Sequence, residues 1–394
     1  MKKRINWGGD SIFWLLYLSY TILYLARLNL SLAGPELQRA GVLNAAQFGL
    51  LGSVFSVVYS CGRLFNGRLG DRLAPKLLIV SGLFLAGFSN LFMTILPPYL
   101  LLLSLWCLNA FGQSMLWSAM LRSVTALYGK DRADKKTPIL VTSVSVGNIV
   151  AIPVTSFLVN NFGMRAAFLV PGCMSVLCAL AVLWILPTPA EGGHTPQFLW
   201  KDLLTDRQVR RILLPAMFHG AMKDNIPLWM AVFFVDRFGI HLENAIWYVL
   251  LIPVVGLAGR LCYPVCYRLA KGREGRITRI CFLGCSVFGG ALCMGKIGPW
   301  TAAACLSLIY ALVSMINTGF LSMFPLRFAD RGWVSSVSGI ADFTTYLGAG
   351  VASAAYGLAI DKSPSGYLIM FGSWMVLSFL AVLLMLPNKQ IKTA

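Results

Sequence analysis

The sequence has few charged residues for its length. Asp, Glu, Lys and Arg make up only 12% of the 394 residues, whereas about a quarter is usual in a soluble protein. Hydrophobic residues make up 57%, and the mean hydropathy is +0.72. A protein in water needs a polar surface around its core, and this chain has too few polar residues to provide one. The composition therefore excludes a soluble globular protein and predicts that lipid surrounds most of the chain.

Acidic residues are scarcer than basic ones. The chain has 15 Asp and Glu against 33 Lys and Arg, for a net charge of +18. A basic surface of that size could indicate a nucleic-acid partner, but the basic residues instead alternate loop by loop. About 26 fall on the side that holds the N-terminus, five on the opposite side and two inside predicted helices. This positive-inside pattern predicts an inner (plasma) membrane protein with both termini in the cytoplasm and no nucleic-acid partner.

The motifs of enzymes and of metal sites are missing. There is no Walker loop, no dinucleotide-binding fingerprint and no nucleophile elbow. The ten cysteines lie in apolar stretches without metal-ligand spacing, and His219 and His241 are too far apart to suggest a zinc site. We therefore expect no enzyme activity, no metal and no cofactor.

Long apolar segments are abundant. Twelve of them have the length needed to cross about 30 Å of hydrocarbon, and most are joined by short connections. They cover residues 11–33, 46–66, 77–96, 98–124, 138–160, 164–186, 211–235, 244–267, 278–296, 299–326, 334–359 and 367–386.

The longest interruption between these segments is rich in Pro, Gly and charge and divides them six and six. The sequence therefore predicts an all-α membrane protein with twelve transmembrane helices in two pseudo-symmetric six-helix bundles. The N-terminal bundle covers residues 1–186, a cytoplasmic linker covers 187–210, and the C-terminal bundle covers 211–394. In such a plan the substrate site lies between the halves near the middle of the membrane.

A local motif follows the second predicted span. The sequence GRLGDRLAPK at residues 67–76 resembles the G-x-x-x-D-R-x-G-R-K loop of the major facilitator superfamily. Gly67 would allow two helices to approach closely, and Asp71, followed by Arg72, would accept hydrogen bonds at a neighbouring helix end and pair with a basic residue. We expect a gating loop here, and an ordinary charged turn is the alternative.

Three ionisable residues fall in the middle layer of predicted spans, where a charge costs about 2.5–3.5 kcal/mol. At ~1.5 Å per residue, Arg27 lies about 20 Å, Lys223 about 18 Å and Asp342 about 12 Å from the cytoplasmic ends of their helices. Arg27 and Lys223 occupy corresponding places in the first helix of each half, so pseudo-symmetry would make them face one another. Because two like charges repel unless an anion lies between them, the sequence predicts a site for a small anionic substrate.

Other polar residues on these helices are candidates for the same site. Tyr20 and Tyr24 share a helical face with Arg27, and His219 lies one turn before Lys223. For the remaining candidates a packing role is an equally good alternative. The full set of additional candidates is Tyr20, Tyr24, Gln113, Trp117, Asn148, His219 and Tyr346.

Two carboxylates are candidates for ion coupling. Asp342 would serve either as a counter-ion for Lys223 or Arg27, or as a group that takes up a proton. Burial favours its protonated form and a nearby cation its ionised form, so both roles stay open. Asp224 follows Lys223 directly and is predicted to point about 100° away from it. There it would either couple an ion, or pair with a neighbouring helix and only orient Lys223.

Longer stretches resemble the organophosphate:phosphate antiporters, the glycerol-3-phosphate and hexose-phosphate carriers. The resemblance rests on YLARLNLSLAGPEL at residues 24–37, YSCGR at 59–63, Gln113 with Trp117, and parts of 338–361. In that family an Arg on helix 1 and an Arg on helix 7 grip the phosphate, and a Lys on helix 2 assists. The resemblance implies these roles for Arg27, Lys223 and Arg63. The helix 7 residue is a Lys here, the helix 5 His is absent, and Asp342 is additional, which favours a carboxylate substrate or proton coupling more than in a faithful member.

Three functions stay open at this point. The first is a monomeric secondary transporter that exchanges an organophosphate for inorganic phosphate by alternating access. The second is a proton- or ion-coupled symporter of an organic carboxylate. The third is a transporter-like membrane sensor of a sugar phosphate.

Overall fold

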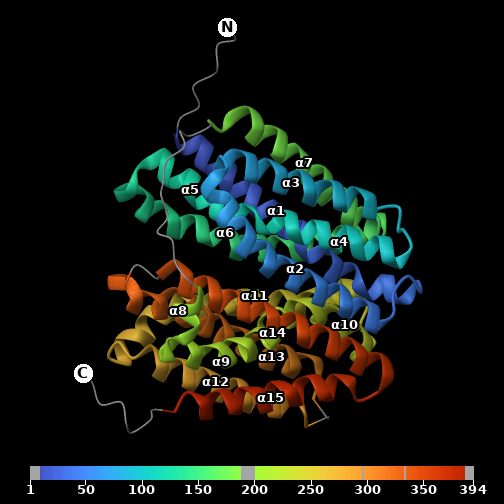
Figure 1. The fold of residues 1–394 in the computed structure, drawn as a ribbon. Helices are drawn as coiled ribbons and strands as arrows, with labels where there is room; N and C mark the ends of the chain where they lie inside the picture. The colour runs from blue at the N-terminus through green and yellow to red at the C-terminus, as the bar shows by residue number, and fades with distance from the viewer. Residues whose placement is uncertain (1–8, 188–199, 295–296, 332–333, 387–394) are drawn as a thin grey trace. The chain divides into compact units, whose positions relative to one another are not determined.

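The computed structural model describes residues 9–187, 200–294, 297–331 and 334–386. Within these ranges the regular structure is helical, with no strand, so the predicted all-α class is confirmed. The chain forms two compact units (Figure 1). Unit 1 consists of residues 1–43 and 58–196, and unit 2 consists of residues 44–57 and 197–394. Helix α2 contributes to both units.

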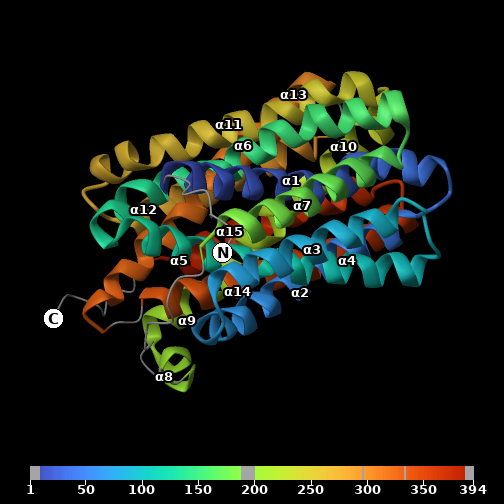
Figure 2. The ribbon, with the colours of Figure 1, turned by 90° about the horizontal axis from the view of Figure 1, so that it is seen from above.

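Unit 1 is built from long helices that run side by side. Its helices are α1 (Gly9–Arg39), the second part of α2 (Ala45–Arg72), α3 (Pro75–Met93), α4 (Tyr99–Ser114), α5 (Leu116–Tyr128), α6 (Lys130–Phe162) and α7 (Ala166–Ile185). Helix α1 packs against α6 and α7, and α3 packs against α4, α5 and α7, as the two ribbon views show (Figures 1 and 2). Inside this core the Asn29 side chain donates to Asn90 Oδ1 at 2.6 Å and to the Ala167 carbonyl at 3.0 Å, which ties α1 to α3 and α7.

Unit 2 contains the remaining helices and the first part of α2. They are α8 (Trp200–Thr205), α9 (Arg207–Lys223), α10 (Asn225–Phe238), α11 (Leu242–Leu269), α12 (Glu274–Leu292), α13 (Pro299–Thr318), the π-helical turn η1 (Gly319–Met323), the 3-10 segment η2 (Phe324–Arg331), α14 (Val334–Lys362) and α15 (Gly366–Leu384). Helix α11 runs along α13, and α12 runs along α15. The first part of α2 lies on α14, where the Ser353 hydroxyl donates to the Gly49 carbonyl at 2.9 Å.

Helices α9 and α14 approach each other unusually closely. A Cβ on Gly220 would lie 1.7 Å from the Thr345 carbonyl oxygen, and one on Gly348 would lie 2.0 Å from the Met217 carbonyl oxygen. Only glycine at both positions permits this separation, because any side chain would overlap the facing backbone. Helix α9 carries Lys223 and α14 carries Asp342, two of the predicted site residues.

Ten helices in the described residues are long and apolar enough to cross a membrane. The predicted seventh span corresponds to α9 and α10, each too short to cross alone. The predicted ninth span is α12, whose first two turns carry Glu274, Arg276 and Arg279. Each of the twelve predicted spans therefore falls mainly on helix.

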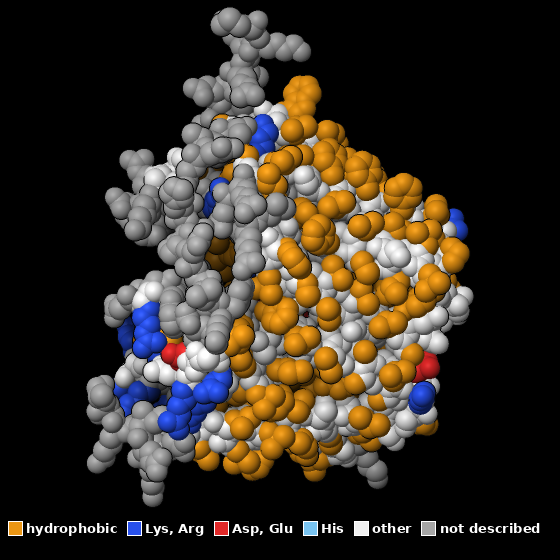
Figure 3. Space-filling model, viewed as in Figure 1, with side chains coloured by type: hydrophobic (Ala, Val, Ile, Leu, Met, Phe, Trp, Pro, Cys, Tyr) orange, Lys and Arg blue, Asp and Glu red, His pale blue; other side chains and the backbone are white. Residues whose placement is uncertain are grey.

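Large apolar side chains are exposed along these helices, as a surface in contact with lipid requires. Trp184 is 80% exposed, Leu100 75% and Phe65 71%. Hydrophobic side chains cover most of the face in Figure 3, and the Lys and Arg side chains lie toward its borders.

Several predicted boundaries differ from the structure. Helix α2 continues to Arg72 instead of ending at 66, and α6 begins at Lys130 instead of 138. The span predicted at 98–124 is interrupted at Met115, whose N–H donates to the Gly112 carbonyl at 3.2 Å, an i→i−3 bond that tightens the turn. Charged sequence ends a membrane span but does not end a helix, which accounts for the two extensions.

Candidate functional site

The candidate residues of unit 1 gather around one tyrosine ring. The guanidinium carbon of Arg27 lies 4.8 Å from the centroid of the Tyr59 ring, and that of Arg63 lies 5.8 Å from the same centroid. Arg27 also lies 5.8 Å from the ring centroid of Tyr24. Cation–π contacts of this kind hold a guanidinium in place without neutralising it. Unit 1 thus presents two positive charges on a shared aromatic support.

Helical spacing accounts for this arrangement. Tyr59 and Arg63 are four residues apart on α2, so their side chains share one face. On α1, the rings of Tyr20 and Tyr24 meet edge to face at 5.8 Å, and Trp117 of α5 lies 5.2 Å from Tyr20. The predicted aromatic face of α1 is therefore continuous with Trp117, and Arg27 lies at its far end.

Gln113 and Asn148 are held by backbone groups. The Gln113 amide donates to the Ala26 carbonyl at 3.3 Å and to Asn109 Oδ1 at 3.0 Å, and Asn109 donates to the same carbonyl at 3.0 Å. These bonds fix α4 against α1 one residue before Arg27. The Asn148 amide donates to the Val144 carbonyl of its own helix at 2.7 Å. Both contacts favour the packing role for these two residues.

The candidate residues of unit 2 gather around Lys223. Its ammonium nitrogen lies 3.0 Å from Asp224 Oδ2 and 3.2 Å from Asp224 Oδ1. The same nitrogen lies 4.2 Å from the centroid of the Tyr346 ring of α14. A carboxylate and an aromatic face thus surround the Lys223 charge.

The pairing of Lys223 with Asp224 corrects the prediction that these side chains point about 100° apart. Adjacent residues of a continuous helix do not face each other, but α9 ends at Lys223 and α10 begins at Asn225. Pro227 accounts for the break, because proline has no N–H to donate to the carbonyl four residues earlier, which is that of Lys223. The ammonium and carboxylate groups meet at this junction between the two helices.

His219 and Asp342 are both buried in unit 2. The His219 Nε2 atom lies 3.4 Å from Asn317 Oδ1, and its ring meets Phe320 of η1 edge to face at 6.2 Å. His219 is fully buried and Asp342 is 7% exposed. His219 thus connects the turn before Lys223 to the irregular end of α13.

The three residues of the predicted gating loop lie in the last turns of α2. The side chains of Gly67, Asp71 and Arg72 fall outside the part of the chain that the structure describes. Their gating role therefore stays a prediction. In the described residues, no group of three or more His, Cys, Asp or Glu side chains could hold a metal ion.

Tyr59 was not among the predicted contact residues. A signal was present in the sequence, because Tyr59 lies one helical turn before Arg63 inside an apolar span. Its contact with Arg27, on another helix, could not be read from that spacing.

Replacing Tyr59 with leucine is expected to raise the KM for substrate by about 3- to 30-fold, which corresponds to the loss of about 0.5–2 kcal/mol of cation–π support. Tyr59→Phe retains the ring and should stay near the wild-type value, so the pair separates the ring from the hydroxyl. Uptake into proteoliposomes measures both variants. An equal loss in Tyr59→Phe and Tyr59→Leu would contradict the role of the ring.

Comparisons with known proteins bear on the family and the fold of the chain. The family model for the Major Facilitator Superfamily matches residues 16–353. A probable hexose phosphate transport protein of Chlamydia trachomatis is 22% identical over 63% of this chain and 59% of its own length. The membrane sensor protein UhpC of Escherichia coli is 25% identical over 47% of this chain and 42% of its own length. A glycerol-3-phosphate transporter of Bacillus subtilis is 21% identical over 88% and 85%. The chain thus spans less than two thirds of the length of the hexose phosphate transport protein and of UhpC.

A solved structure supports the fold. The crystal structure of a D-xylose-proton symporter aligns with a TM-score of 0.76 and 13% sequence identity, over 98% of this chain and 100% of that one. The relatives named above are transporters and a membrane sensor, in agreement with the prediction that the chain is not an enzyme. A family model that covers most of the helices, together with the matching fold, shows that the chain belongs to the Major Facilitator Superfamily.

Proposed function

We propose that the chain is a secondary transporter that exchanges a small organophosphate for inorganic phosphate by alternating access of its two halves. The observation that carries this proposal is the contact of Arg27 and Arg63 with the single ring of Tyr59. Two guanidinium groups held in an apolar bundle repel one another, and an anion bound to both relieves that repulsion. Guanidinium groups also match the geometry of phosphate and carboxylate oxygens, because each can donate two parallel hydrogen bonds.

The contacts of the candidate cations suggest which of them bind the anion. In unit 1 the guanidinium groups of Arg27 and Arg63 lie against the ring of Tyr59, where each can form paired hydrogen bonds with an oxyanion. In unit 2 the charge of Lys223 is matched by Asp224. We therefore assign the first contact with the anion to Arg27 and Arg63.

The relatives named as hexose phosphate and glycerol-3-phosphate transport proteins support a phosphate ester as the substrate. The apolar helices support an integral membrane protein. We place the chain in the inner membrane with both termini in the cytoplasm, on the basis of the distribution of its basic residues.

A second function, the coupled symport of an organic carboxylate, is favoured by the carboxylates of unit 2. Asp342 is almost completely buried and Asp224 pairs with the ammonium group of Lys223. A carboxylate that exchanges a cation partner for a proton would couple substrate movement to a proton gradient. The two functions differ in what drives transport, so uptake experiments with one proteoliposome preparation can distinguish them.

The test uses the purified protein in proteoliposomes loaded with inorganic phosphate. Uptake of labelled glycerol-3-phosphate or glucose-6-phosphate without a pH gradient, and only when phosphate is present inside, is the result expected for exchange. Uptake of an organic carboxylate that requires an inward proton gradient would favour symport. Saturable binding of a sugar phosphate without any flux would contradict both and favour a sensor, as one relative is named.

Asp342→Asn separates the two transport mechanisms directly. For phosphate exchange, the variant should retain counterflow within about threefold of wild type, because no proton has to be carried. For symport, it should lose gradient-driven uptake. Asp361→Asn is the matched control, since Asp361 is an exposed carboxylate near the end of the same helix. Loss of counterflow in Asp342→Asn with full activity in Asp361→Asn would contradict simple exchange.

A further inference from the structure

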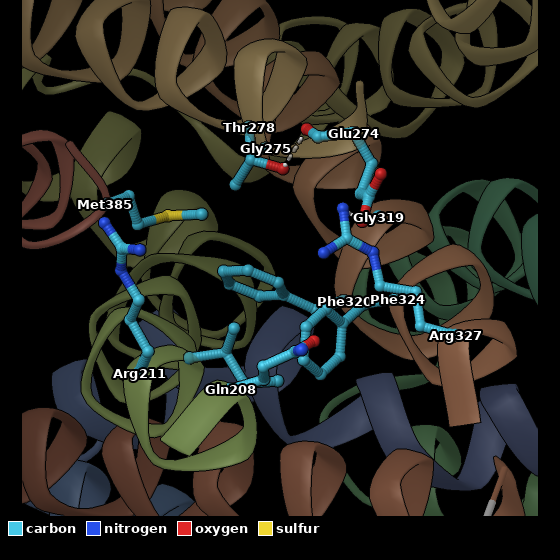
Figure 4. A pocket seen from close by; sticks show the side chains of 11 residues that line it. Gln208, Arg211, Glu274, Gly275, Thr278, Gly319, Phe320, Phe324, Arg327 and Met385 are labelled. Carbon is cyan, nitrogen blue, oxygen red and sulfur yellow. Dashed lines mark hydrogen bonds and ion pairs between the residues drawn. The ribbon is translucent and has the colours of Figure 1, made fainter. Parts of the chain in front are cut away.

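Unit 2 contains a cavity of about 320 Å³ that is distinct from the candidate site around Lys223. It lies at the end of the bundle where α9 and α12 begin, and η1, η2 and Met385 complete its wall (Figure 4). Arg211 of this cavity precedes Lys223 by three turns of α9, about 18 Å at ~1.5 Å per residue. A cavity of this volume is at the lower end of the range for small-molecule sites.

Two guanidinium groups line the cavity on opposite sides of the Phe320 ring (Figure 4). Arg211 donates through Nε to the Leu384 carbonyl at 3.4 Å and through a terminal nitrogen to the Leu386 carbonyl. Carbonyl oxygens orient this guanidinium but do not neutralise it. Arg327 forms an ion pair with the buried carboxylate of Glu274. The lining therefore has one net positive charge, which comes from Arg211.

Helix α12 adds to the positive potential. Its first turn lies at the cavity, where Gly275 is part of the lining, and α12 begins without a side-chain cap. The unpaired N–H groups of a helix's first turn carry partial positive charge and favour anions. In α9, by contrast, Asp206 already accepts from the N–H groups of Gln208 and Val209. The cation on α9 and the first turn of α12 therefore attract the same kind of ligand.

The rest of the wall combines apolar side chains with Gln208 and Thr278, and one buried hydroxyl lies nearby. Ile212, Phe320 and Phe324 offer surface for an organic group. Tyr263 is 2% exposed, and its hydroxyl has no hydrogen-bond partner among the described residues. That oxygen lies 3.4 Å from where a Cβ on Gly319 would be, and Gly319 lines the cavity. An amphiphilic anion suits this wall better than a bare inorganic ion.

We propose that this cavity is a second anion site, which binds the phosphate group of an organic phosphate with its apolar part against Phe320 and Phe324. The phosphate belongs either to a soluble monoester or to the headgroup of an anionic phospholipid, because basic pockets between membrane helices suit both. Phe320 also contacts His219, one turn before Lys223, so the wall of this cavity adjoins the helix that carries the transport candidate.

The test measures binding of phenyl phosphate by titration calorimetry to the full-length chain in phosphatidylcholine nanodiscs. The Arg27→Gln background removes the candidate transport site, so any remaining binding is independent of the proposed function. We expect one phenyl phosphate to bind per chain in this background. Adding Gln208→Glu should weaken that binding about tenfold, because it places a negative charge in the lining. Gln208 is exposed at the start of α9, so this change leaves the fold intact.

Arg210→Gln is the control, since Arg210 is exposed on the same helix and does not line the cavity. Arg211→Gln provides a second variant and should also weaken binding about tenfold.

Phosphatidylglycerol added to the nanodiscs distinguishes the source of the phosphate. If it raises the melting temperature in the Arg27→Gln background but not after Gln208→Glu, the ligand is a lipid headgroup; binding of phenyl phosphate alone identifies a soluble ester. Absence of both responses in the Arg27→Gln background would overturn the proposal.

Discussion

Replacing Arg27 with alanine is expected to weaken substrate binding by at least about a hundredfold and to abolish measurable uptake. A charge-assisted hydrogen bond contributes about 1.5–3 kcal/mol, and a guanidinium can form two of them with one oxyanion. The loss of about 3 kcal/mol or more corresponds to a factor of at least about a hundred. Arg63 remains on the Tyr59 ring in this variant, but the second cation, Arg27, is gone. Binding is measured by thermal shift with glucose-6-phosphate, and uptake in proteoliposomes.

Arg39→Ala is the control for this experiment. Arg39 lies at the end of the same helix, is exposed, and pairs with Glu36 at 2.8 Å, so its loss should leave uptake near the wild-type rate. Arg27→Lys should fall between the two, because an ammonium group keeps the charge but cannot form the paired hydrogen bonds of a guanidinium. Near-normal uptake by Arg27→Ala would eliminate the proposed anion site of unit 1.

Replacing Gly220 with alanine is expected to destabilise the protein by at least about 3 kcal/mol, at the upper end of the cost of overpacking. The added Cβ would lie 1.7 Å from the Thr345 carbonyl oxygen and 2.6 Å from its carbonyl carbon. Both atoms belong to the backbone of α14, so no side-chain rotation can relieve the overlap. Helices α9 and α14 would have to separate, which would also move Lys223 away from Tyr346. Thermal unfolding in detergent and the fraction that elutes as a monodisperse species measure the effect.

Gly339→Ala serves as the comparison on α14. No described atom lies within 4 Å of a Cβ built on Gly339, and alanine is favoured over glycine inside a helix by about 0.5–1 kcal/mol. This variant should therefore unfold at the wild-type temperature or slightly above it. If Gly220→Ala were as stable as Gly339→Ala, the close crossing of α9 and α14 would not exist in the folded protein.

The ion pair of Lys223 with Asp224 differs from the arrangement that the sequence predicted. From pseudo-symmetry, Arg27 and Lys223 were expected to face one another with an anion between them. The structure instead matches Lys223 with the carboxylate of Asp224, whereas Arg27 rests against the rings of Tyr24 and Tyr59. The contacts of Lys223 thus include a carboxylate and the Tyr346 ring, and those of Arg27 include two tyrosine rings.

The candidate site was predictable where it depends on spacing along one helix. The common face of Tyr20, Tyr24 and Arg27 follows from the helical repeat, and the contact of Tyr20 with Tyr24 agrees with it. The predicted direction of Asp224 was wrong because it assumed an unbroken helix, although Pro227 was present in the sequence. A proline inside a predicted span is an identifiable signal for such a break.

The sequence by itself determined the class of this protein. Its hydropathy, its scarcity of charge and its twelve apolar segments follow from the chemistry of the lipid environment, which acts on every residue alike and so can be read from composition and length. Only the tertiary structure decided that Arg27 lies against the same Tyr59 ring as Arg63, that Asp224 pairs with Lys223, and that Arg211 and Arg327 line one cavity. These contacts join residues from different helices or across a helix break, and their distances depend on how closely the helices pack. The separation of two helices, such as α9 and α14 at Gly220, is set by many residues together. No local pattern in the sequence encodes it.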